Sequence, residues 1–301
     1  MIKKTNDSEF AILESINPDI WNLFLKNLYK SEWPQNFPHP ILDNLFQTTS
    51  IRPKKFFSIK KKDSISGISV TNIEKKISRA VTFLGIKRIN FSEPDSKKLI
   101  QSNINYLKKM HIQKMHIQTQ EHDLQIQNIL TKLGFKKIKK YSNLIHDRNI
   151  LQSIEIPKTL ELHYLQIGDE KIFTDILNKV FENEWGFCPN TVKEIIHSIY
   201  SSGNSLKDIV VLKKNNKFVS FNWTVILKKN VGKIGMLGVH PKFRNLGIGK
   251  ITALAGMNYL KSNNIKTITL EVDEINLPAV KLYTELGFKK YFSTIWFEKI
   301  L

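Results

Sequence analysis

Apolar residues recur along the second half of the chain with two different periods. Alternating apolar and polar positions predict strands at 160–165, 209–213, 218–227, 233–239, 267–272 and 290–297. Helical spacing of apolar residues predicts helices at 169–184, 191–200, 249–261 and 276–286. Asn215 and Asn216 are placed to form a hairpin turn between two of the strands. This order of elements predicts an α/β domain with a mixed sheet.

The first half of the chain repeats the second half at a fixed offset. Tyr106 to Lys108 reads YLK, as does Tyr259 to Lys261, 153 residues later. Leu133 to Lys137 and Leu286 to Lys290 both read LGFKK at the same offset, with no gap needed between the two matches. Chance similarity rarely holds one register over such a distance, so we expect a duplicated domain. The predicted domains are residues 1–150 and 158–301.

The composition limits which kinds of protein this chain can be. The chain has 301 residues, of which 41% are hydrophobic, which suits a folded protein with two cores. Cys188 is the only cysteine, so no internal disulfide can form, and no metal site is expected. The sequence shows no signal-peptide core and no run near the ~18 apolar residues of a membrane span. We therefore expect a cytoplasmic protein with no membrane partner.

The charge of the chain is strongly basic and unevenly spread. The formal net charge is +19. Residues 1–150 hold 26 basic and 13 acidic side chains, whereas residues 151–301 hold 20 and 14. A basic first half would suit an anionic partner such as RNA. A solvated lysine-rich surface is the simpler interpretation, so nucleic-acid binding is an alternative that we do not favour.

A glycine-containing loop at residues 237–250 (LGVHPKFRNLGIGK) has the clearest chemical character. Pro241 breaks the preceding strand, and Gly247 and Gly249 open the following helix. Glycines let the backbone approach a ligand closely, and the N–H groups at a helix start attract phosphate. Arg244 adds a planar donor that suits a pyrophosphate. An ordinary strand-to-helix turn is the simpler alternative.

Two common phosphate-binding motifs do not fit this loop. A Walker A loop needs Ser or Thr after Gly249-Lys250, where this chain has Ile251. A dinucleotide fingerprint needs a third glycine where this chain has Thr252.

The loop and a second motif together resemble a known family. Val239-x-Pro241-x-x-Arg244-x-x-Gly247-x-Gly249, followed by Asn276-x-x-Ala279-x-x-x-Tyr283-x-x-x-Gly287-Phe288, closely resembles the GNAT superfamily of N-acetyltransferases. The resemblance covers roughly residues 158–298. It implies an α/β (α+β) fold in which two tandem domains each have a mixed, mostly antiparallel sheet flanked by helices.

The resemblance also implies a role for each motif residue toward acetyl-CoA, the expected co-substrate. The strand ends at 237–239 and 270–272 would splay to hold the pantetheine arm, and a backbone N–H near Leu237 would face the thioester oxygen. Asn276 would contact the arm, and Tyr283 would protonate the departing thiolate. The expected cofactor-binding residues are Leu237, Gly238, Val239, Arg244, Asn245, Leu246, Gly247, Ile248, Gly249, Lys250 and Asn276.

The chemistry of these residue types agrees with the implied roles. A tyrosine, with a usual pKa of ~10, can donate a proton to a thiolate whose conjugate acid has a pKa of ~8.5. Tyr283 lies seven residues after Asn276, on the same face of the predicted helix. The structural alternatives are that Asn276 only caps the helix and that Tyr283 only packs in the core.

The general base and the acceptor site are less defined by the sequence. Glu271 is the nearest carboxylate to the predicted site, and Asp273, Glu274 and His240 are further candidates for the base. A structural carboxylate at Glu271, with deprotonation through water, is equally compatible with the pattern. The family resemblance implies that Trp185 and Phe187 line the acceptor pocket. The alternative is that these two aromatic residues only cover the sheet.

The first half lacks the residues that form the two motifs of the second half. At the offset of 153 residues, the motif positions fall on Phe91, Pro94, Ser96, Asp123 and Leu130. The segment 90–96 has no glycine and contains Glu93 and Asp95, whose negative charges would repel a pyrophosphate. We expect a degenerate domain that keeps the fold but has no coenzyme A loop.

These observations predict an acyl-CoA-dependent N-acyltransferase. It would move an acetyl group from acetyl-CoA to a primary amine by direct attack in a ternary complex. The acceptor is a small molecule, a peptide or protein amine, or an aminoacyl-tRNA, and the basic first half slightly favours an anionic or macromolecular one. A monomer or a homodimer is expected. The alternatives are a non-catalytic acyl-CoA sensor and a basic module that binds nucleic acid or protein on the same fold.

Overall fold

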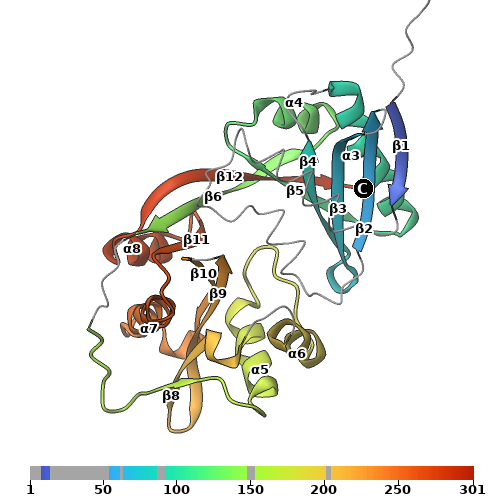
Figure 1. The fold of residues 1–301 in the computed structure, drawn as a ribbon. Helices are drawn as coiled ribbons and strands as arrows, with labels where there is room; N and C mark the ends of the chain where they lie inside the picture. The colour runs from blue at the N-terminus through green and yellow to red at the C-terminus, as the bar shows by residue number, and fades with distance from the viewer. Residues whose placement is uncertain are drawn as a thin grey trace, which may run out of the picture.

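A computed structural model describes residues 8–13, 54–61, 64–86, 92–147, 153–200, 205–228 and 230–301. Within these ranges the strands form one 12-stranded sheet in the order β1-β2-β3-β4-β5-β12-β6-β11-β10-β9-β8-β7 (Figure 1). Neighbouring strands are antiparallel except for β4 with β5 and β10 with β11, which are parallel. The predicted class, an α/β fold with mixed, mostly antiparallel sheets, is confirmed.

The elements of the two halves follow the same order. The first half contains β1 (Ser8–Leu13), β2 (Lys54–Lys61), β3 (Ser64–Glu74), β4 (Arg79–Ile86), α3 (Glu93–Lys109), β5 (Lys114–Gln120), α4 (Leu124–Lys132) and β6 (Lys136–His146). The second half contains β7 (Glu161–Tyr164), α5 (Glu170–Phe181), α6 (Val192–Tyr200), β8 (Ile209–Lys214), β9 (Lys217–Lys228), β10 (Val231–Val239), α7 (Ile248–Ser262), β11 (Thr267–Asp273), α8 (Leu277–Glu285) and β12 (Lys289–Ile300).

The duplication predicted from the sequence is visible in these bounds. Adding 153 to the bounds of β5 gives those of β11, and the same holds for α4 and α8. The helices and strands predicted for the second half all form, within one to three residues of the expected ends. Asn215 and Asn216 have φ angles of 49° and 60°, as a tight hairpin turn between β8 and β9 requires.

The two halves exchange their last strands. β12, the end of the second half, pairs with β5 of the first half, and β6 pairs with β11 of the second. In Figure 1 the red β12 lies beside the green β6 and reaches into the half that holds the blue strands. Ile295 and Phe297 of β12 are therefore buried in the core of the first half, while Leu144 of β6 is buried in the core of the second. The two sheets are joined into one, a feature that the sequence did not predict.

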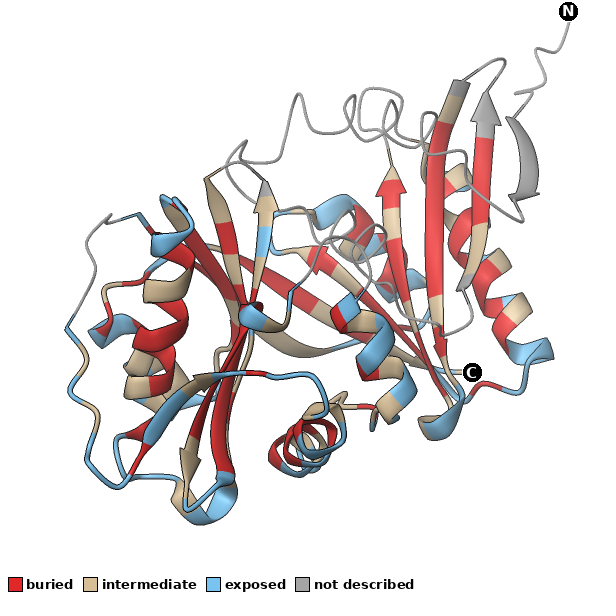
Figure 2. Ribbon diagram, turned by 60° about the horizontal axis from the view of Figure 1, so that its bottom comes forward, coloured by how far each residue is buried: buried red, intermediate tan, exposed pale blue. Residues whose placement is uncertain are grey.

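Helices cover both faces of the sheet in the second half. Phe221 of β9 packs against Phe173 of α5, with ring centroids 5.2 Å apart. The next residue, Asn222, donates to the carbonyl oxygen of Thr252 in α7 at 3.2 Å. Because successive side chains of a strand point to opposite faces, α5 and α7 lie on opposite faces. Figure 2 shows the resulting buried residues along the middle of the strands. Within the described ranges, no helix has the length and apolar character that a bilayer span requires.

Candidate active site

A cavity opens where two parallel strands part. β10 and β11 are paired only from Val231 to Lys233, against Thr267 to Thr269, and they separate beyond that point. Gly235 is the extra residue of a β-bulge, because Ile234 pairs with Thr224 and Met236 with its neighbour Trp223. The cavity between the parted ends has a volume of about 590 Å³. This is the splay expected at 237–239 and 270–272.

The edge of β10 that faces the cavity presents backbone donors. The N–H of His240 donates to the carbonyl oxygen of Val219 in β9 at 2.8 Å. N–H groups point alternately to the two edges of a strand, so those of Leu237 and Val239 point away from β9. That is the edge that β11 has left. Leu237 and Val239 both line the cavity, so their N–H groups are placed to meet a ligand.

The loop after β10 holds a second set of backbone donors. Asn245 and Gly247 have φ angles of 62° and 74°, in the left-handed region, and Gly247 caps the start of α7 without a side-chain bond. Within the described part of the chain, the N–H groups of residues 245–249 donate to no protein acceptor. Unpaired N–H groups at the start of a helix suit an anion.

The two glycines of this loop are required for different reasons. A Cβ at Gly247 would meet nothing within 4 Å, so its positive φ is the reason for glycine there. A Cβ at Gly249 would lie 3.6 Å from Val239 and 3.8 Å from Leu282, which are ordinary contacts. Neither protein packing nor a positive φ therefore requires a glycine at position 249. A closely approaching ligand would.

The side chains of the loop differ in what they can offer a ligand. Arg244 donates through Nε to the carbonyl oxygen of Val239 at 3.2 Å and through Nη2 to that of Val180 at 3.0 Å. Its guanidinium, predicted to bind pyrophosphate, thus ties the loop to the end of α5. Ile248 is buried and anchors the loop in the core, whereas Leu246 and Lys250 are exposed. Leu246, Gly247, Ile248 and Lys250 do not line the cavity, in contrast to Arg244, Asn245 and Gly249.

Tyr283 of α8 lines the same cavity. Its side chain is only 7% exposed, and its ring packs edge-on against Phe288, with centroids 5.7 Å apart. Within the described residues its hydroxyl makes no hydrogen bond to the protein. Burial raises the pKa of Tyr283 above its usual value, which keeps the hydroxyl protonated at neutral pH. Tyr283 is therefore a core residue that also lines the cavity.

Asn276 caps a helix and also lines the cavity. Its Oδ1 accepts from the N–H of Ala279 at 3.2 Å, so the residue caps α8 as predicted. Asn276 also lines the cavity, and its Nδ2 donates to no protein group within the described ranges.

Glu271 is the carboxylate that best fits a base in this cavity. It lines the cavity, and its Oε1 accepts from Nε2 of Gln118 and, at 2.8 Å, from Oγ1 of Thr294. Asp273 also lines the cavity but forms an ion pair with Lys139 at 2.6 Å. Within the described part of the chain, the hydrogen-bond partners of Glu271 are therefore neutral side chains.

The other candidates for the base have different roles. Burial raises the pKa of Glu274, but hydrogen bonds from Lys290, Ser142 and Ser293 outweigh it and hold that pKa at about 2. Nδ1 of His240 accepts from the N–H of Lys242 at 3.3 Å. Neither Glu274 nor His240 lines the cavity. Within the described ranges, no group of three or more His, Cys, Asp or Glu is placed to hold a metal ion.

The opposite end of the cavity contains aromatic residues from both halves. Trp185 and Phe187 line it, as expected from the resemblance. The Trp185 ring packs edge-on against His116 of β5 at 5.1 Å and Trp296 of β12 at 5.8 Å. Tyr141 of β6 lines the cavity as well, and sequence reasoning missed it. It has no motif of its own, and only the strand exchange brings it here.

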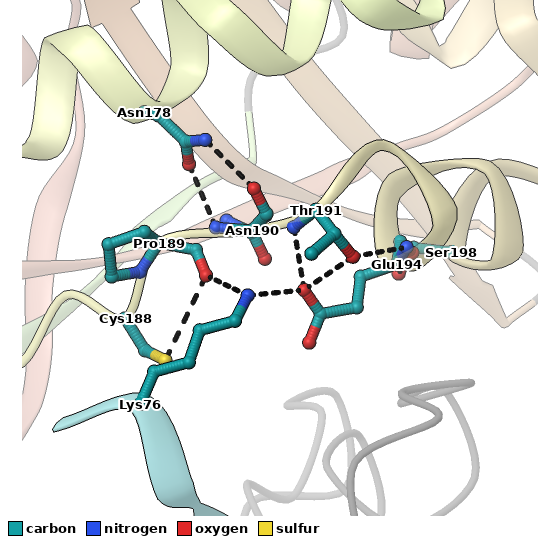
Figure 3. Close-up of polar contacts among 8 residues, drawn as sticks. All are labelled: Lys76, Asn178, Cys188, Pro189, Asn190, Thr191, Glu194 and Ser198. Carbon is teal, nitrogen blue, oxygen red and sulfur yellow. Dashed lines mark hydrogen bonds and ion pairs between the residues drawn. The ribbon is translucent and has the colours of Figure 1, made fainter.

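The segment that holds Trp185 is fastened to the first half. Nζ of Lys76 donates to the carbonyl oxygen of Pro189 at 2.9 Å and pairs with Glu194 at 3.2 Å (Figure 3). The side chain of Asn178 makes two hydrogen bonds to the backbone of Asn190, both 2.9 Å long (Figure 3). Cys188, in the same segment, is buried, which agrees with a structural role.

The corresponding helix start in the first half has a different character. Ser92 caps α3 by accepting from the N–H of Asp95 at 3.4 Å. Glu93 pairs with Lys132 at 2.9 Å. Ser96 and Leu130, at the positions of Gly249 and Tyr283, are buried in the core, and Asp123 caps α4 as Asn276 caps α8. Phe91 lies outside the described residues. The first turn of α3 thus contains acidic side chains, whereas the first turn of α7 contains none.

Part of the chain is similar in sequence to known proteins. Residues 171–288 match the model of the acetyltransferase (GNAT) family. A mycothiol acetyltransferase of Thermomonospora curvata is 31% identical over 83 residues, which is 28% of each chain. One of Acidothermus cellulolyticus is 29% identical over 190 residues, 58% of each chain. The alignments thus span less than two thirds of these relatives' lengths.

Solved structures resemble the whole chain. A GCN5-related N-acetyltransferase from Sphaerobacter thermophilus has a TM-score of 0.77, with 12% identity over 97% of this chain and 95% of that one. A tandem GNAT protein from the clavulanic acid biosynthesis pathway has a TM-score of 0.79, with 11% identity over 98% of both chains. These likenesses concern the fold. Residues 171–288 thus match the acetyltransferase (GNAT) family, and the chain as a whole is similar in fold to a tandem GNAT protein.

Proposed function

We propose that this protein transfers an acetyl group from acetyl-CoA to a primary amine, with its active site in the second half. One observation carries the proposal. The cavity between β10 and β11 is flanked by backbone N–H groups and lined by the buried Tyr283, and within the described residues neither these N–H groups nor the Tyr283 hydroxyl has a hydrogen-bond partner. The name of the curated relatives, mycothiol acetyltransferase, supports acetyl as the group transferred.

The residues present fit acetyl-CoA, which supplies an activated acetyl thioester when bound. The N–H groups of residues 245–249 would donate to its pyrophosphate, where the space beside Gly249 allows a close approach. The N–H of Val239 and the amide of Asn276 would hold the pantetheine arm. The N–H of Leu237 would stabilise the negative charge that develops on the thioester oxygen. Arg244 acts through the backbone that it holds in place.

Two side chains would move the protons. Direct attack needs a neutral amine, and Glu271 is placed to accept the proton of the arriving ammonium. Tyr283 would donate its proton to the departing sulfur, and its raised pKa means that the hydroxyl carries its proton at neutral pH. The first half is inferred to have no coenzyme A site, because its helix start contains Glu93 and Asp95.

Calorimetric titration with acetyl-CoA tests the binding part of the proposal. We expect about one site per chain, weakened in an Arg244→Ala, Gly247→Ala variant whose folding is checked by its melting temperature. Two sites per chain would overturn the assignment of the first half. No binding by the folded protein would overturn the proposed function.

A second measurement distinguishes an enzyme from an acyl-CoA sensor. Tyr283→Phe removes one hydroxyl and leaves the packing of the ring unchanged. We expect turnover of acetyl-CoA with amines to fall about 100-fold or more, the range for loss of a general acid, with acetyl-CoA affinity intact. Equal turnover in the variant would show that Tyr283 is not the acid. Absence of turnover with every amine by the unmodified protein would favour the sensor.

A further inference from the structure

The end of the cavity that is lined by Trp185, Phe187 and Tyr141 is called the acceptor end here. Its charge is opposite in sign to the net charge of the whole chain. The net charge of the protein is +19. At this end, however, the cavity is lined by the carboxylates of Glu184, Glu271 and Asp273, together with the hydroxyl of Tyr141. The cavity also contains one lining cation, Arg244, at the loop end, where its guanidinium is bonded to backbone carbonyl oxygens.

Within the described residues, two of these three carboxylates have no cationic partner. Asp273 is neutralised by Lys139 at 2.6 Å. Glu271 accepts only from the neutral side chains of Gln118 and Thr294. The carboxylate of Glu184 makes no ion pair with any described residue. Counting the described residues alone, the acceptor end contains about two negative charges without a cationic partner.

Tyr141 of β6 is paired in register with Asp273 of β11 and lines the same cavity as Glu184 and Glu271. Burial raises the pKa of Tyr141, and the charges of Asp273, Glu271 and Glu184 raise it further. Arg79 acts in the opposite sense, but its guanidinium is paired with Glu74. The three carboxylates therefore line one cavity together with a hydroxyl that the first half contributes.

A separate observation shows that this is a ligand site and not only an acidic surface. Tyr283 lines the same cavity, is more than nine-tenths buried, and has an unpartnered hydroxyl. The hydroxyl oxygen itself is not enclosed by protein atoms, so it is free to form a hydrogen bond with a molecule bound in the cavity. The aromatic side chains of Trp185 and Phe187 line the acceptor end and suit a small organic molecule.

We propose that the acceptor is a small amine with a second positive charge, bound between Tyr141 of the first half and the carboxylates of Glu184 and Glu271. The inference rests on the proposed function and names its substrate class. A monoamine would leave one carboxylate unbalanced after giving its proton to Glu271. With a diamine, Glu184 pairs with the charge that remains.

The reaction balances with these groups. The amine nitrogen forms the new N–C bond as the C–S bond breaks, and it loses two protons in total. One proton leaves through Glu271 to solvent. The other replaces the proton that Tyr283 gives to the sulfur, so the products are the N-acetyl diamine, coenzyme A and one released proton. The basic first half had suggested an anionic acceptor, but it places its Tyr141 in an acidic pocket.

Matched acceptors test the charge requirement. Linear diamines of three to six carbons are compared with monoamines and ω-amino acids of the same length, at saturating acetyl-CoA, by the release of coenzyme A thiol. An ion pair with a partly exposed carboxylate leads us to expect roughly fivefold higher kcat/KM for the diamine than for its monoamine. The ω-amino acid is expected to react more slowly than either.

Two variants assign the effect to the pocket. Glu184→Gln should reduce kcat/KM for the diamines roughly fivefold and reduce that for the monoamines by less. Glu182→Gln is the matched control, because Glu182 lies two residues away, is exposed, and pairs with Lys179 at 2.7 Å outside the cavity. The control should react as the unmodified protein does.

The outcomes separate this inference from the proposed function. Failure to bind acetyl-CoA would overturn both. If acetyl-CoA binds but no diamine outpaces its matched monoamine at any length, the inference is wrong while the proposed function stands. A preference for the ω-amino acids, or a loss in Glu182→Gln equal to that in Glu184→Gln, would overturn the inference in the same way.

Discussion

Two glycines of the site are predicted to respond in opposite ways to an added methyl group. A Cβ at Gly238 would lie 2.7 Å from Val180 Cγ1 and 2.8 and 2.9 Å from ring carbons of Phe221, where ordinary contacts begin at 3.4 Å. Val180 and Phe221 are both buried, so neither can move aside freely. Overpacking of this kind costs about 1–3 kcal/mol, and we expect Gly238→Ala to lower the free energy of unfolding by that amount.

The same substitution at Gly249 should leave stability intact. A Cβ there would meet its neighbours at 3.6 and 3.8 Å, and its φ lies outside the left-handed region. Alanine in a helix is favoured over glycine by about 0.5–1 kcal/mol, so Gly249→Ala should be as stable as the unmodified protein or slightly more stable. The methyl group would nevertheless occupy the space beside the loop N–H groups. We expect the Kd for acetyl-CoA to rise about tenfold, equivalent to about 1.4 kcal/mol.

Urea denaturation and calorimetric titration of both variants check this pair of predictions. The free energy of unfolding should be lowered in Gly238→Ala and not in Gly249→Ala. The Kd for acetyl-CoA should be raised in Gly249→Ala. If Gly249→Ala binds acetyl-CoA as tightly as the unmodified protein does, the ligand does not approach the loop at this position. If Gly238→Ala is fully stable, the packing argument for that glycine is refuted.

Three further predictions follow from the contacts between the halves. Lys76→Met removes the clamp on the segment of Trp185: we expect the KM for the acceptor to rise roughly threefold, with stability changed by at most about 1 kcal/mol. Lys75→Met is its control, and an equal rise there would refute the clamp. Glu274→Gln should lower the free energy of unfolding at pH 7 by about 1–2 kcal/mol, since the carboxylate is partly exposed. The pKa of Glu274 is depressed from 4.5 to about 2, so this difference should be complete above pH 4.5 and disappear as the pH falls toward 2; urea titrations that show a constant difference would contradict it. Phe297→Ala should cost about 3–5 kcal/mol, and the halves should still unfold in one transition by circular dichroism, whereas two separate transitions would contradict the joined core.

Much of the fold and part of the site were predictable from the sequence, because they depend on local patterns. Alternation and helical spacing depend on which face of an element is buried, so the elements of the second half were placed closely. The offset of 153 residues appears in the bounds of the matching strands and helices. Gly247 was recognisable because a positive φ at a helix start selects glycine, and Asn276 because its side chain caps the next helix.

The tertiary structure decided which groups meet across the chain. β6 and β12 follow the same LGFK motif in the two copies, so local sequence cannot say which half each strand joins. Strand pairing depends on backbone hydrogen bonds that either partner can supply. The exchange of β6 and β12 brings Tyr141 and Gln118 of the first half into the same site as Glu271. The position of α5 provides the carbonyl oxygen of Val180, to which Arg244 donates a hydrogen bond. The sequence determined the elements and the chemical types, and packing between distant segments decided which of those groups share a cavity.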